Sequence, residues 1–379
     1  MVIHLWVPIL FELKGGIQTY LLDVLATLAE GFADYRVEVI DKLDRDLPDE
    51  VDLPEGFSFS GSGGKFKALT GPQFVFQLVR RAFLHRPQLI LCGHVNYAPV
   101  AHWLNQLLGI PYWVFVYGIE IWDLKSRSKI KALHGATKII CISNYTRDRL
   151  IKEQNLSPDQ FAPLPVTFHT HRYSIAGKPE FLLRRYGLTQ DQPVILTVAR
   201  LSDTERYKGY DRILEALPTI RQFLPTVHYL LVGKGNDMPR IQAMVDELGL
   251  GGCVTLTGFI PDEELTAHYQ LCDVFAMPSK KEGFGIVYLE ALACGKPTLG
   301  GNQDGALDAL CRGELGALVD PDDVQAIAHT LVEILQGTYP NPLIYQPEQL
   351  RQRVIDIYGF ERFKRTLKGY LDDFMETGI

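Results

Sequence analysis

The chain has 379 residues, of which 46% are hydrophobic and 22% are charged, a size and balance typical of two globular domains. Its formal net charge of -7 argues against a nucleic-acid partner that binds mainly through phosphate neutralisation. Six cysteines without a Cys-x-x-Cys pair indicate reduced thiols rather than a disulfide framework.

The first half alternates predicted strands and helices. A loop with Gly15 and Gly16 follows the first strand, and the next residues have apolar side chains at helical spacing from Ile17 to Leu28. Residues 41–71 are rich in Asp, Pro, Gly and Ser, so we expect a long surface loop with at most one short strand. The predicted strands are residues 2–7, 36–40, 88–92, 112–117 and 137–142.

The second half repeats this rhythm after a linker over residues 163–179. Helices are predicted over 211–224, 324–335 and 360–374, and strands over 194–199, 227–232, 254–256, 274–277 and 297–300. The pattern predicts an α/β protein with two Rossmann-like, doubly wound parallel sheets. We expect domains over 1–165 and 178–357, with a C-terminal helix, 360–379, that packs back on the first domain.

The most informative motif runs from Glu282 to Glu290, directly after a predicted strand. Gly283 and Gly285 flank Phe284, so the backbone there can turn tightly and approach a ligand. A helix is expected from about Ile286, and the free amides at its start suit a phosphate group. The two glutamates then suit sugar hydroxyls, which donate hydrogen bonds. The alternative is one loop acid and one helix acid on a solvated surface.

A pair of cations, Arg200 and Lys208, forms the second motif. Arg200 follows a predicted strand, at the edge where open α/β sheets bind ligands, and Lys208 precedes a predicted helix. Two cations can neutralise a leaving diphosphate, which a divalent metal does in other enzymes. The alternative is two surface cations, one of them paired with Asp203 or Glu205.

His94 follows a strand of the first half, where it is either a ligand contact or a structural histidine. Gly15 and Gly16 gain interest from lying between the first strand and the first helix. The chain has no dinucleotide-binding glycine fingerprint and no Walker A motif. We therefore expect no organic cofactor and no catalytic metal ion.

Taken together, these motifs resemble glycosyltransferase family 4, a large family of retaining enzymes with the GT-B fold, in which two Rossmann-like domains face a central cleft. The Glu-x7-Glu motif of the family corresponds to Glu282 and Glu290, and its Arg and Lys pair to Arg200 and Lys208. One departure lies downstream, where Asp304 stands in place of a glycine common in the family.

The resemblance implies roles for these residues. The second domain binds a nucleotide sugar, whose diphosphate contacts Arg200, Lys208 and the backbone of two glycine-containing loops. Glu290 binds the ribose, Glu282 binds the transferred sugar, and His94 lies near the reacting carbon. The nucleobase meets the backbone near Phe259 and Ile260. The loop residues assigned to the donor are Gly15, Gly16, Gly283, Phe284, Gly285 and Ile286.

The function expected from the resemblance is metal-independent, retaining transfer of a hexose to a glycan, lipid-linked or polysaccharide-precursor acceptor. UDP-glucose is the expected donor, and GDP-mannose is the alternative. A nucleotide-sugar epimerase with the same fold and a sugar-binding protein without catalysis stay open. The resemblance implies front-face attack, in which the acceptor attacks on the side from which the phosphate departs. The departing phosphate oxygen then takes the proton of the acceptor, so no enzymatic base is required.

A basic run, Lys125, Arg127, Lys129 and Lys131, lies in the otherwise neutral first half. It is either a solvated surface or a contact with lipid headgroups or the phosphate of a lipid-linked acceptor. The apolar start of the chain has no basic leader and no segment reaches the length of a membrane span. The sequence thus predicts a cytoplasmic protein, with contact to the inner face of a membrane left open.

Overall fold

The computed structural model describes residues 1–12, 15–31, 35–48, 51–63 and 67–378. The described chain divides into two compact units. Unit 1 comprises residues 1–167 and 361–379, and unit 2 comprises residues 168–360. The chain therefore leaves unit 1, builds all of unit 2, and returns.

The sheet of unit 1 is parallel, with strand order β3-β2-β1-β4-β5-β6-β7. Its strands are β1 Val2–Val7, β2 Arg36–Asp41, β3 Phe57–Gly61, β4 Leu89–Cys92, β5 Tyr112–Val116, β6 Lys138–Cys141 and β7 Phe161–Pro163. Its helices are α1 Gly16–Gly31, α2 Lys67–His85, α3 Ala98–Leu108, α4 Arg127–His134, α5 Asn144–Gln154 and α14 Phe360–Thr377. Part of the loop predicted over 41–71 lies outside the described residues.

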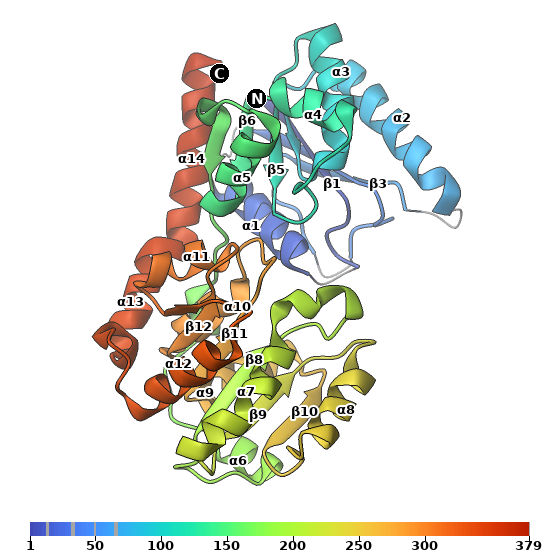
Figure 1. Cartoon of the computed structure of the whole chain (residues 1–379). Coiled ribbons are helices and arrows are strands. Elements are labelled where there is room, and N and C mark those ends of the chain that lie inside the picture. Colours follow the sequence, from blue (N-terminus) through green and yellow to red (C-terminus); the bar gives the residue numbers. More distant parts are fainter. Residues whose placement is uncertain (13–14, 32–34, 49–50, 64–66, 379) are drawn as a thin grey trace. The chain divides into compact units, whose positions relative to one another are not determined.

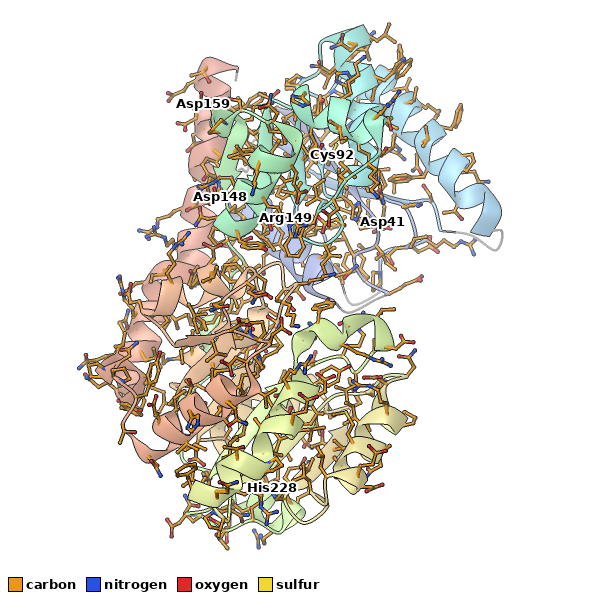
Figure 2. All side chains as sticks on the ribbon, in the orientation of Figure 1. Asp41, Cys92, Asp148, Arg149, Asp159 and His228 are labelled. Carbon is orange, nitrogen blue, oxygen red and sulfur yellow. The ribbon has the colours of Figure 1, made fainter. Side chains whose placement is uncertain are left out.

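The strands of unit 1 are buried and largely apolar, as the continuous hydrophobic runs predict, with buried polar side chains at a few positions of β1 and β2. Cys92, at the end of β4, lies within this layer in Figure 2, and all six cysteines are free thiols. Helix α14 completes the core: Tyr370 donates a hydrogen bond to the carbonyl of Pro163, and Phe374 packs edge-on against Trp113.

Unit 2 repeats the architecture with a parallel sheet of order β10-β9-β8-β11-β12-β13. Its strands are β8 Val194–Val198, β9 His228–Val232, β10 Val254–Gly258, β11 Val274–Met277, β12 Thr298–Gly301 and β13 Ala317–Val319. Its helices are α6 Glu180–Tyr186, α7 Tyr210–Phe223, α8 Met238–Glu247, α9 Asp262–Leu271, α10 Ile286–Ala293, α11 Ala306–Ala309, α12 Val324–Gln336 and α13 Pro347–Tyr358.

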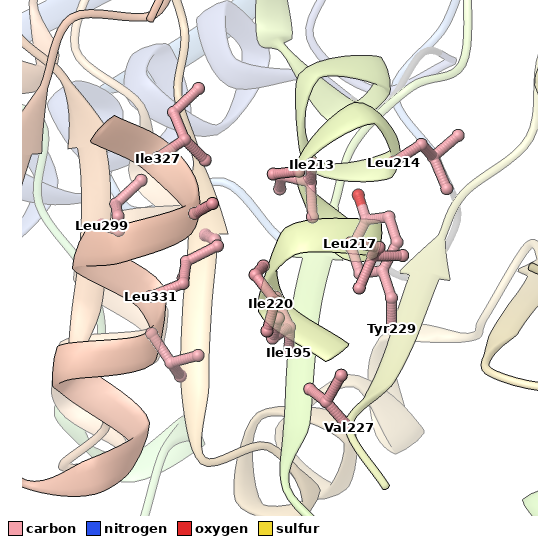
Figure 3. Packing of buried hydrophobic residues seen from close by; sticks show 14 of the residues in the cluster. Ile195, Ile213, Leu214, Leu217, Ile220, Val227, Tyr229, Leu299, Ile327 and Leu331 are labelled. Carbon is pink, nitrogen blue, oxygen red and sulfur yellow. The ribbon is translucent and has the colours of Figure 1, made fainter. Parts of the chain in front are cut away.

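The core of unit 2 forms where α7 and α12 pack side by side on the sheet (Figure 3). Ile213, Leu217 and Ile220 lie on one face of α7, at helical spacing, and are fully buried. Leu331 of α12 and Ile195 of β8 belong to the same cluster. The apolar periodicity of the two helices thus fixes them on one face of the sheet.

Each sheet reverses its strand order at one point, between β1 and β4 in unit 1 and between β8 and β11 in unit 2. Doubly wound sheets bind ligands at this switch point, outside the carboxyl ends of the strands. Figure 1 shows the strands of each unit running as one layer with helices on both faces. The fold therefore marks one candidate binding edge in each unit.

Candidate functional site

The predicted donor residues of unit 2 gather at its switch point. Arg200 follows β8 by two residues, and the loop with Glu282 joins β11 to α10. Strands β8 and β11 are neighbours, with Ile195 opposite Val274. The motifs found in the sequence therefore lie at the carboxyl edge where this fold binds ligands.

Two cations and two carboxylates form a connected group at this edge. The guanidinium of Arg200 lies 3.0 Å from Oε1 of Glu205. Nζ of Lys208 lies 2.9 Å from Oε2 of Glu282 and 3.8 Å from Oε2 of Glu205. The pairing of Arg200 with Glu205 is the structural alternative considered for this motif, and it coexists with placement at the switch point.

Exposure distinguishes the two cations. The side chain of Arg200 is 64% exposed, whereas that of Lys208 is 14% exposed. Burial alone would lower the pKa of Lys208, but the charge of Glu282 and the hydrogen bond to it raise the pKa above its ordinary value. Lys208 is therefore a nearly buried ammonium that stays charged at neutral pH, and Arg200 is an exposed cation paired with Glu205.

Gly209 permits the close approach of Lys208 to the residues that follow β11. Lys208 ends the 3₁₀ turn Asp203–Lys208, and Gly209, with a φ of 75°, starts α7. A Cβ at Gly209 would lie 2.2 Å from the carbonyl oxygen of Pro278. Only glycine fits this left-handed, crowded position, so Gly209 sets the location of Lys208.

The loop that carries Glu282 is anchored from β12. The carboxylate of Asp304 accepts hydrogen bonds from the Glu282 amide (2.7 Å), the Ser279 hydroxyl (2.7 Å) and the Ala306 amide (2.9 Å). Burial raises the pKa of Asp304 to about 6. The next residue, Gly305, also donates its amide to the carbonyl of Glu282. The residue that departs from the family pattern thus fixes the central motif.

Phe284 and Gly285 hold the loop against the core. The Phe284 side chain is buried and packs edge-on against Tyr358. Gly285 has a φ of 90° and caps α10, which starts at Ile286 as predicted. The backbone between Gly283 and Ile286 therefore lies at a helix N-terminus, next to the Glu282 that contacts Lys208, while the aromatic side chain is buried.

Glu290 belongs to a different group of contacts. Its side chain is nearly buried, and each carboxylate oxygen accepts one tyrosine hydroxyl. Tyr173 donates to Oε1 at 2.7 Å, and Tyr269 donates to Oε2 at 2.6 Å. Burial raises the pKa of Glu290, and the two hydroxyls oppose that rise. The predicted alternative of a solvated helix acid is therefore wrong for Glu290.

Phe259 and Ile260 follow β10 at the same edge of the sheet. The Phe259 ring is 59% exposed, and Nζ of Lys234, which follows β9, lies 4.7 Å from the ring centroid. An exposed aromatic side chain beside a cation is suited to stacking against a planar ring of a ligand.

His94 lies at the corresponding edge of unit 1, two residues after β4. Its Nδ1 accepts a hydrogen bond from the Asn96 amide at 3.1 Å and caps a short 3₁₀ turn. Burial, with Lys129 and Lys42 nearby, lowers the pKa of His94 to about 4. The imidazole is neutral at pH 7, and because Nδ1 accepts, Nε2 carries the proton and is a donor.

Gly15 and Gly16 follow β1, the other strand at the switch point of unit 1. The Gly15 carbonyl accepts the amide of Thr19, and α1 starts at Gly16. A Cβ at Gly16 would meet no atom of the described residues within 4 Å. Packing of the described chain therefore does not require glycine at position 16.

A second polar cluster lies in unit 1, among β1, β2 and α2. His4 Nε2 and His85 Nδ1 lie 3.0 Å and 2.6 Å from the same oxygen of Glu38. In the described part of the chain, these three side chains have the donor types and spacing of a metal site. Burial lowers the pKa of His4 to about 3, so this imidazole is neutral at pH 7. Arg81 pairs with the other oxygen of Glu38, and we assign the cluster to an internal polar network around that ion pair.

Sequence reasoning missed several residues that the structure places at the site. Tyr173 lies in the predicted linker, and Tyr269 lies in α9 without any motif around it. Asp304 was noted only as a departure from the family pattern. For Asp304, the sequence did hold one signal of a site residue, namely an acid and a glycine that follow the end of a buried strand.

Both halves of the chain match models of known families. Residues 14–172 match the model described as Glycosyltransferase Family 4, and residues 180–353 match the model described as Glycosyl transferases group 1. Among the helices that the structure describes, none is both long enough and apolar enough to cross a membrane.

A similar curated protein is the GDP-mannose-dependent alpha-(1-6)-phosphatidylinositol monomannoside mannosyltransferase of Mycolicibacterium smegmatis. It is 36% identical over 208 residues, which cover 53% of this chain and 53% of the relative. The chain thus spans about half the length of this relative.

Solved structures extend the likeness in fold to the whole chain. The Thermosynechococcus elongatus sucrose-phosphate synthase has a TM-score of 0.80 at 21% identity, with 99% of each chain covered. Anabaena HepE in complex with UDP has a TM-score of 0.79 at 19% identity, with 98% of this chain and 100% of that chain covered. The two parallel sheets are those of the GT-B fold, and with both halves matched to glycosyltransferase models, this chain belongs to glycosyltransferase family 4.

Proposed function

We propose that this protein is a retaining glycosyltransferase that transfers a hexose from a nucleotide sugar bound by unit 2. The observation that carries the proposal is the pair Arg200 and Lys208 at the switch point, with Lys208 in contact with Glu282 in the loop that leads to the N-terminus of α10. This arrangement supplies two positive charges and a set of backbone amides, which suit a diphosphate.

In this proposal, the donor diphosphate binds to the group formed by Arg200, Lys208, Glu205 and Glu282, whose charges cancel before the ligand is bound. A bound diphosphate replaces Glu205 and Glu282 as the partner of the two cations. Glu282 is then released to accept hydrogen bonds from hydroxyls of the transferred sugar. As the bond from the sugar to the phosphate breaks, Arg200 and Lys208 stabilise the charge that develops on the leaving group. No metal ion is needed for that task.

The remaining assignments follow the chemistry of each group. Glu290, with two tyrosine donors, accepts hydrogen bonds from the ribose hydroxyls. Phe259 and Ile260 meet the nucleobase. The proton on Nε2 of His94 suits a hydrogen bond to the donor or the acceptor, and Gly15 and Gly16 allow backbone to approach a phosphate. The roles of His94 and the two glycines stay predictions carried by the resemblance.

The donor is proposed to be GDP-mannose or UDP-glucose. UDP-glucose was the expectation from the sequence, whereas the 36% identical relative is named as GDP-mannose-dependent. The likeness to HepE with UDP supports the fold alone. We therefore place GDP-mannose first in any assay. The acceptor is proposed to be a glycan or lipid-linked glycan, since that relative is named for a phosphatidylinositol mannoside.

A thermal-shift screen of nucleotide sugars tests the proposal. A donor that binds only the folded state raises the melting temperature by mass action. We expect one nucleotide sugar and its nucleoside diphosphate to stabilise the protein, and the sugar to be transferred or slowly hydrolysed with release of the diphosphate. Failure of all nucleotide sugars to bind would reject the proposal.

Analysis of the reaction products distinguishes a transferase from an epimerase and from a sugar-binding protein. Conversion of the donor to an isomer without acceptor would assign an epimerase, and tight binding of a sugar without turnover would assign a binding protein. Activity that survives EDTA is expected, because Arg200 and Lys208 take the place of a metal. Complete loss on chelation would contradict the metal-free mechanism.

A further inference from the structure

One segment of unit 1 has an unusual charge composition. Residues 56–147 contain eleven lysines and arginines but only two acids, Glu120 and Asp123, in a chain with a net charge of -7. Helices α2, α3 and α4 lie within this segment and contain no acidic residue at all. Such a sharp local excess of positive charge favours an anionic partner.

The three helices form one surface. Helix α3 packs beside both α2 and α4, and all three contribute to the same core cluster under the sheet of unit 1 (Figure 1). Phe74, Leu104 and Leu133 are the inward residues of α2, α3 and α4, in that order. The opposite sides of the three helices therefore face outward together. We call this outward side the α2–α4 surface.

Large apolar side chains are exposed on this surface. Phe76 and Phe83 of α2 lie seven residues apart, two helical turns, and therefore share a face. Phe76 is 69% exposed, and Trp103 on α3 is 49% exposed. The exposed large apolar residues of the two helices are Val75, Phe76, Phe83, Leu84, Trp103 and Leu107. Exposing this much apolar area to water is unfavourable, and such a concentration of exposed apolar side chains is typical of an interaction site.

Cations surround the apolar side chains. Arg80 lies between Phe76 and Phe83 on α2, and the guanidinium of Arg86 lies 5.6 Å from the Phe83 ring centroid. The basic run lies at and just before α4, and its exposed members are Lys125, Arg127 and Lys131. In the described ranges, no carboxylate pairs with Arg80, Arg86 or the basic run.

We propose that the α2–α4 surface binds an anionic lipid bilayer. Aromatic and aliphatic side chains on helices that lie along the surface enter the headgroup boundary, and the cations around them pair with lipid phosphates. The same surface on a second copy would bring like charges together, which disfavours a symmetric dimer. The proposal does not rest on the transferase activity, because it concerns residues outside the donor site.

Cosedimentation with lipid vesicles tests this proposal on the whole chain. One set of vesicles is phosphatidylcholine, and in the other phosphatidylglycerol replaces about a third of it. Each cation near an anionic bilayer contributes about 1 kcal/mol, roughly a fivefold change in partitioning. We expect wild type to prefer the anionic vesicles strongly and to dissociate as salt is raised.

Two variants separate the charge from the apolar contact. In the basic-run variant, Lys125, Arg127, Lys129 and Lys131 are changed to Gln, and the anionic preference is expected to fall by two orders of magnitude or more. In the apolar variant, Phe76→Gln, Phe83→Gln and Trp103→Gln, binding is expected to fall while the salt dependence stays. The changed side chains of the apolar variant are exposed, so its fold should be retained.

Matched controls are available elsewhere on the molecule. Arg362 and Arg365 are exposed cations of α14, and Phe181 and Phe223 are exposed aromatics of unit 2. Their Gln variants are expected to bind vesicles as wild type does. The proposal is overturned if wild type shows no preference for anionic vesicles, or if the apolar variant binds as wild type does. Self-association that the apolar variant abolishes, without vesicle binding, would instead assign the surface to a second copy.

Discussion

At the scale of single residues, the candidate donor site is an ion-paired group that is neutral before any ligand binds. Glu205 contacts both cations, and Glu282 contacts Lys208. An anionic ligand must therefore compete with two carboxylates that are already in place. The affinity of the site depends on these competitors as well as on the cations.

Removing one competitor should strengthen binding of the bare nucleotide. Glu205→Gln leaves Arg200 without its carboxylate partner, and a partly buried ion pair of this kind is worth about 1 kcal/mol, or roughly fivefold in Kd. Calorimetric titration with GDP and UDP measures the change. Glu215→Gln, which breaks an ion pair with Arg212 on α7, is the control. Unchanged affinity in Glu205→Gln would show that Glu205 does not compete with the ligand.

Removing the buried cation should affect the chemical step. Lys208→Ala is expected to lower kcat roughly a hundredfold or more, because losing one group that stabilises a developing charge costs about 3 kcal/mol. Arg200→Ala is expected to act in the same direction. Steady-state kinetics and a thermal melt separate turnover from folding. Near-normal turnover in both variants would remove them from the mechanism, and Arg212→Ala is the matched control.

The two tyrosines should set the pH range over which Glu290 binds ribose. Tyr269→Phe removes a hydrogen-bond donor from a buried carboxylate, so the pKa of Glu290 rises further above its ordinary value. In the proposed function the ionised form accepts the ribose hydroxyls, so nucleotide binding on the acid side should weaken at a higher pH than in wild type. Tyr173→Phe should act alike. Tyr229→Phe, which loses a hydroxyl bond to Thr197, is the buried control.

Calorimetric titration with nucleotide at a series of pH values measures how the affinity depends on pH in each variant. A 2′-deoxynucleotide should lose part of the effect, because it lacks one of the hydroxyls. An identical pH profile for Tyr269→Phe and wild type would mean that ionisation of Glu290 does not control nucleotide binding.

At the scale of elements, the loop between β11 and α10 is positioned by β12 rather than by its own sequence. The carboxylate of Asp304 accepts hydrogen bonds on both oxygens, and Gly305 passes so close that a Cβ there would lie 2.1 Å from the carbonyl oxygen of Gly283. Glu282 therefore keeps its place only while these two residues are present.

Asp304→Asn should loosen this loop. An amide has one acceptor oxygen, so its NH₂ group would face the amide of Glu282 or of Ala306, and a buried unsatisfied group costs about 1–3 kcal/mol. We expect a lower melting temperature and a lower kcat. Asp323→Asn is the control, because Asp323 caps α12 through one oxygen and asparagine is an equally good cap. Equal effects of the two variants would refute the anchoring role.

The same carboxyl group gives a pH dependence with a defined sign. The pKa of Asp304 is raised to about 6, so the folded state holds its proton over a range in which the unfolded chain has released it. This group therefore contributes most to stability at low pH, and the contribution is lost as pH rises from about 4 to 6. In Asp304→Asn, the part of the fall in melting temperature between about pH 4 and 6 that is due to Asp304 should be absent.

Elements with strong periodicity could be predicted from the sequence, and short or locally weak ones could not. The strand over 274–277 and helix α12 were predicted almost to the residue, since apolar runs bounded by turns leave little choice. Strands β7 and β13 were missed because each has three residues and depends on its neighbour in the sheet. The Rossmann-like pattern, the GT-B fold and the family were predicted correctly.

For the site, the sequence singled out residues that lie together at the sheet edge, and it missed the contacts between them. It singled out Arg200, Lys208 and Glu282 because these charged residues lie just beyond predicted strands or just before predicted helices, where a doubly wound sheet binds its ligand. The contacts of Glu290 with Tyr173 and Tyr269 join residues 117 and 21 positions apart, and no local pattern records such distances.

At the scale of the whole molecule, unit 1 is discontinuous in sequence. Helix α14 returns to it after unit 2, with Phe363, Leu367, Leu371 and Phe374 buried. Tyr20 packs edge-on against Phe363. The stability of unit 1 therefore depends on residues at the far end of the chain.

Substitutions in α14 should destabilise unit 1 selectively. Leu367→Ala or Leu371→Ala leaves a cavity in a buried position, which costs about 2–5 kcal/mol. Calorimetric melting with and without nucleotide distinguishes the units, because the ligand bound by unit 2 raises only the transition of that unit. We expect the other transition to fall by several degrees. An equal shift of both transitions would mean that the two units unfold together.

The return of α14 also bears on how the chain is made. Domains generally fold in order as the ribosome releases them. Here β1 to β7 leave the ribosome before unit 2, yet the helix that covers Trp113 and Tyr20 is translated only after every strand of unit 2. The nascent unit 1 thus lacks the partners of Trp113 and Tyr20 while unit 2 is synthesised and can already fold. In this protein the second unit to be translated is the first that can be completed.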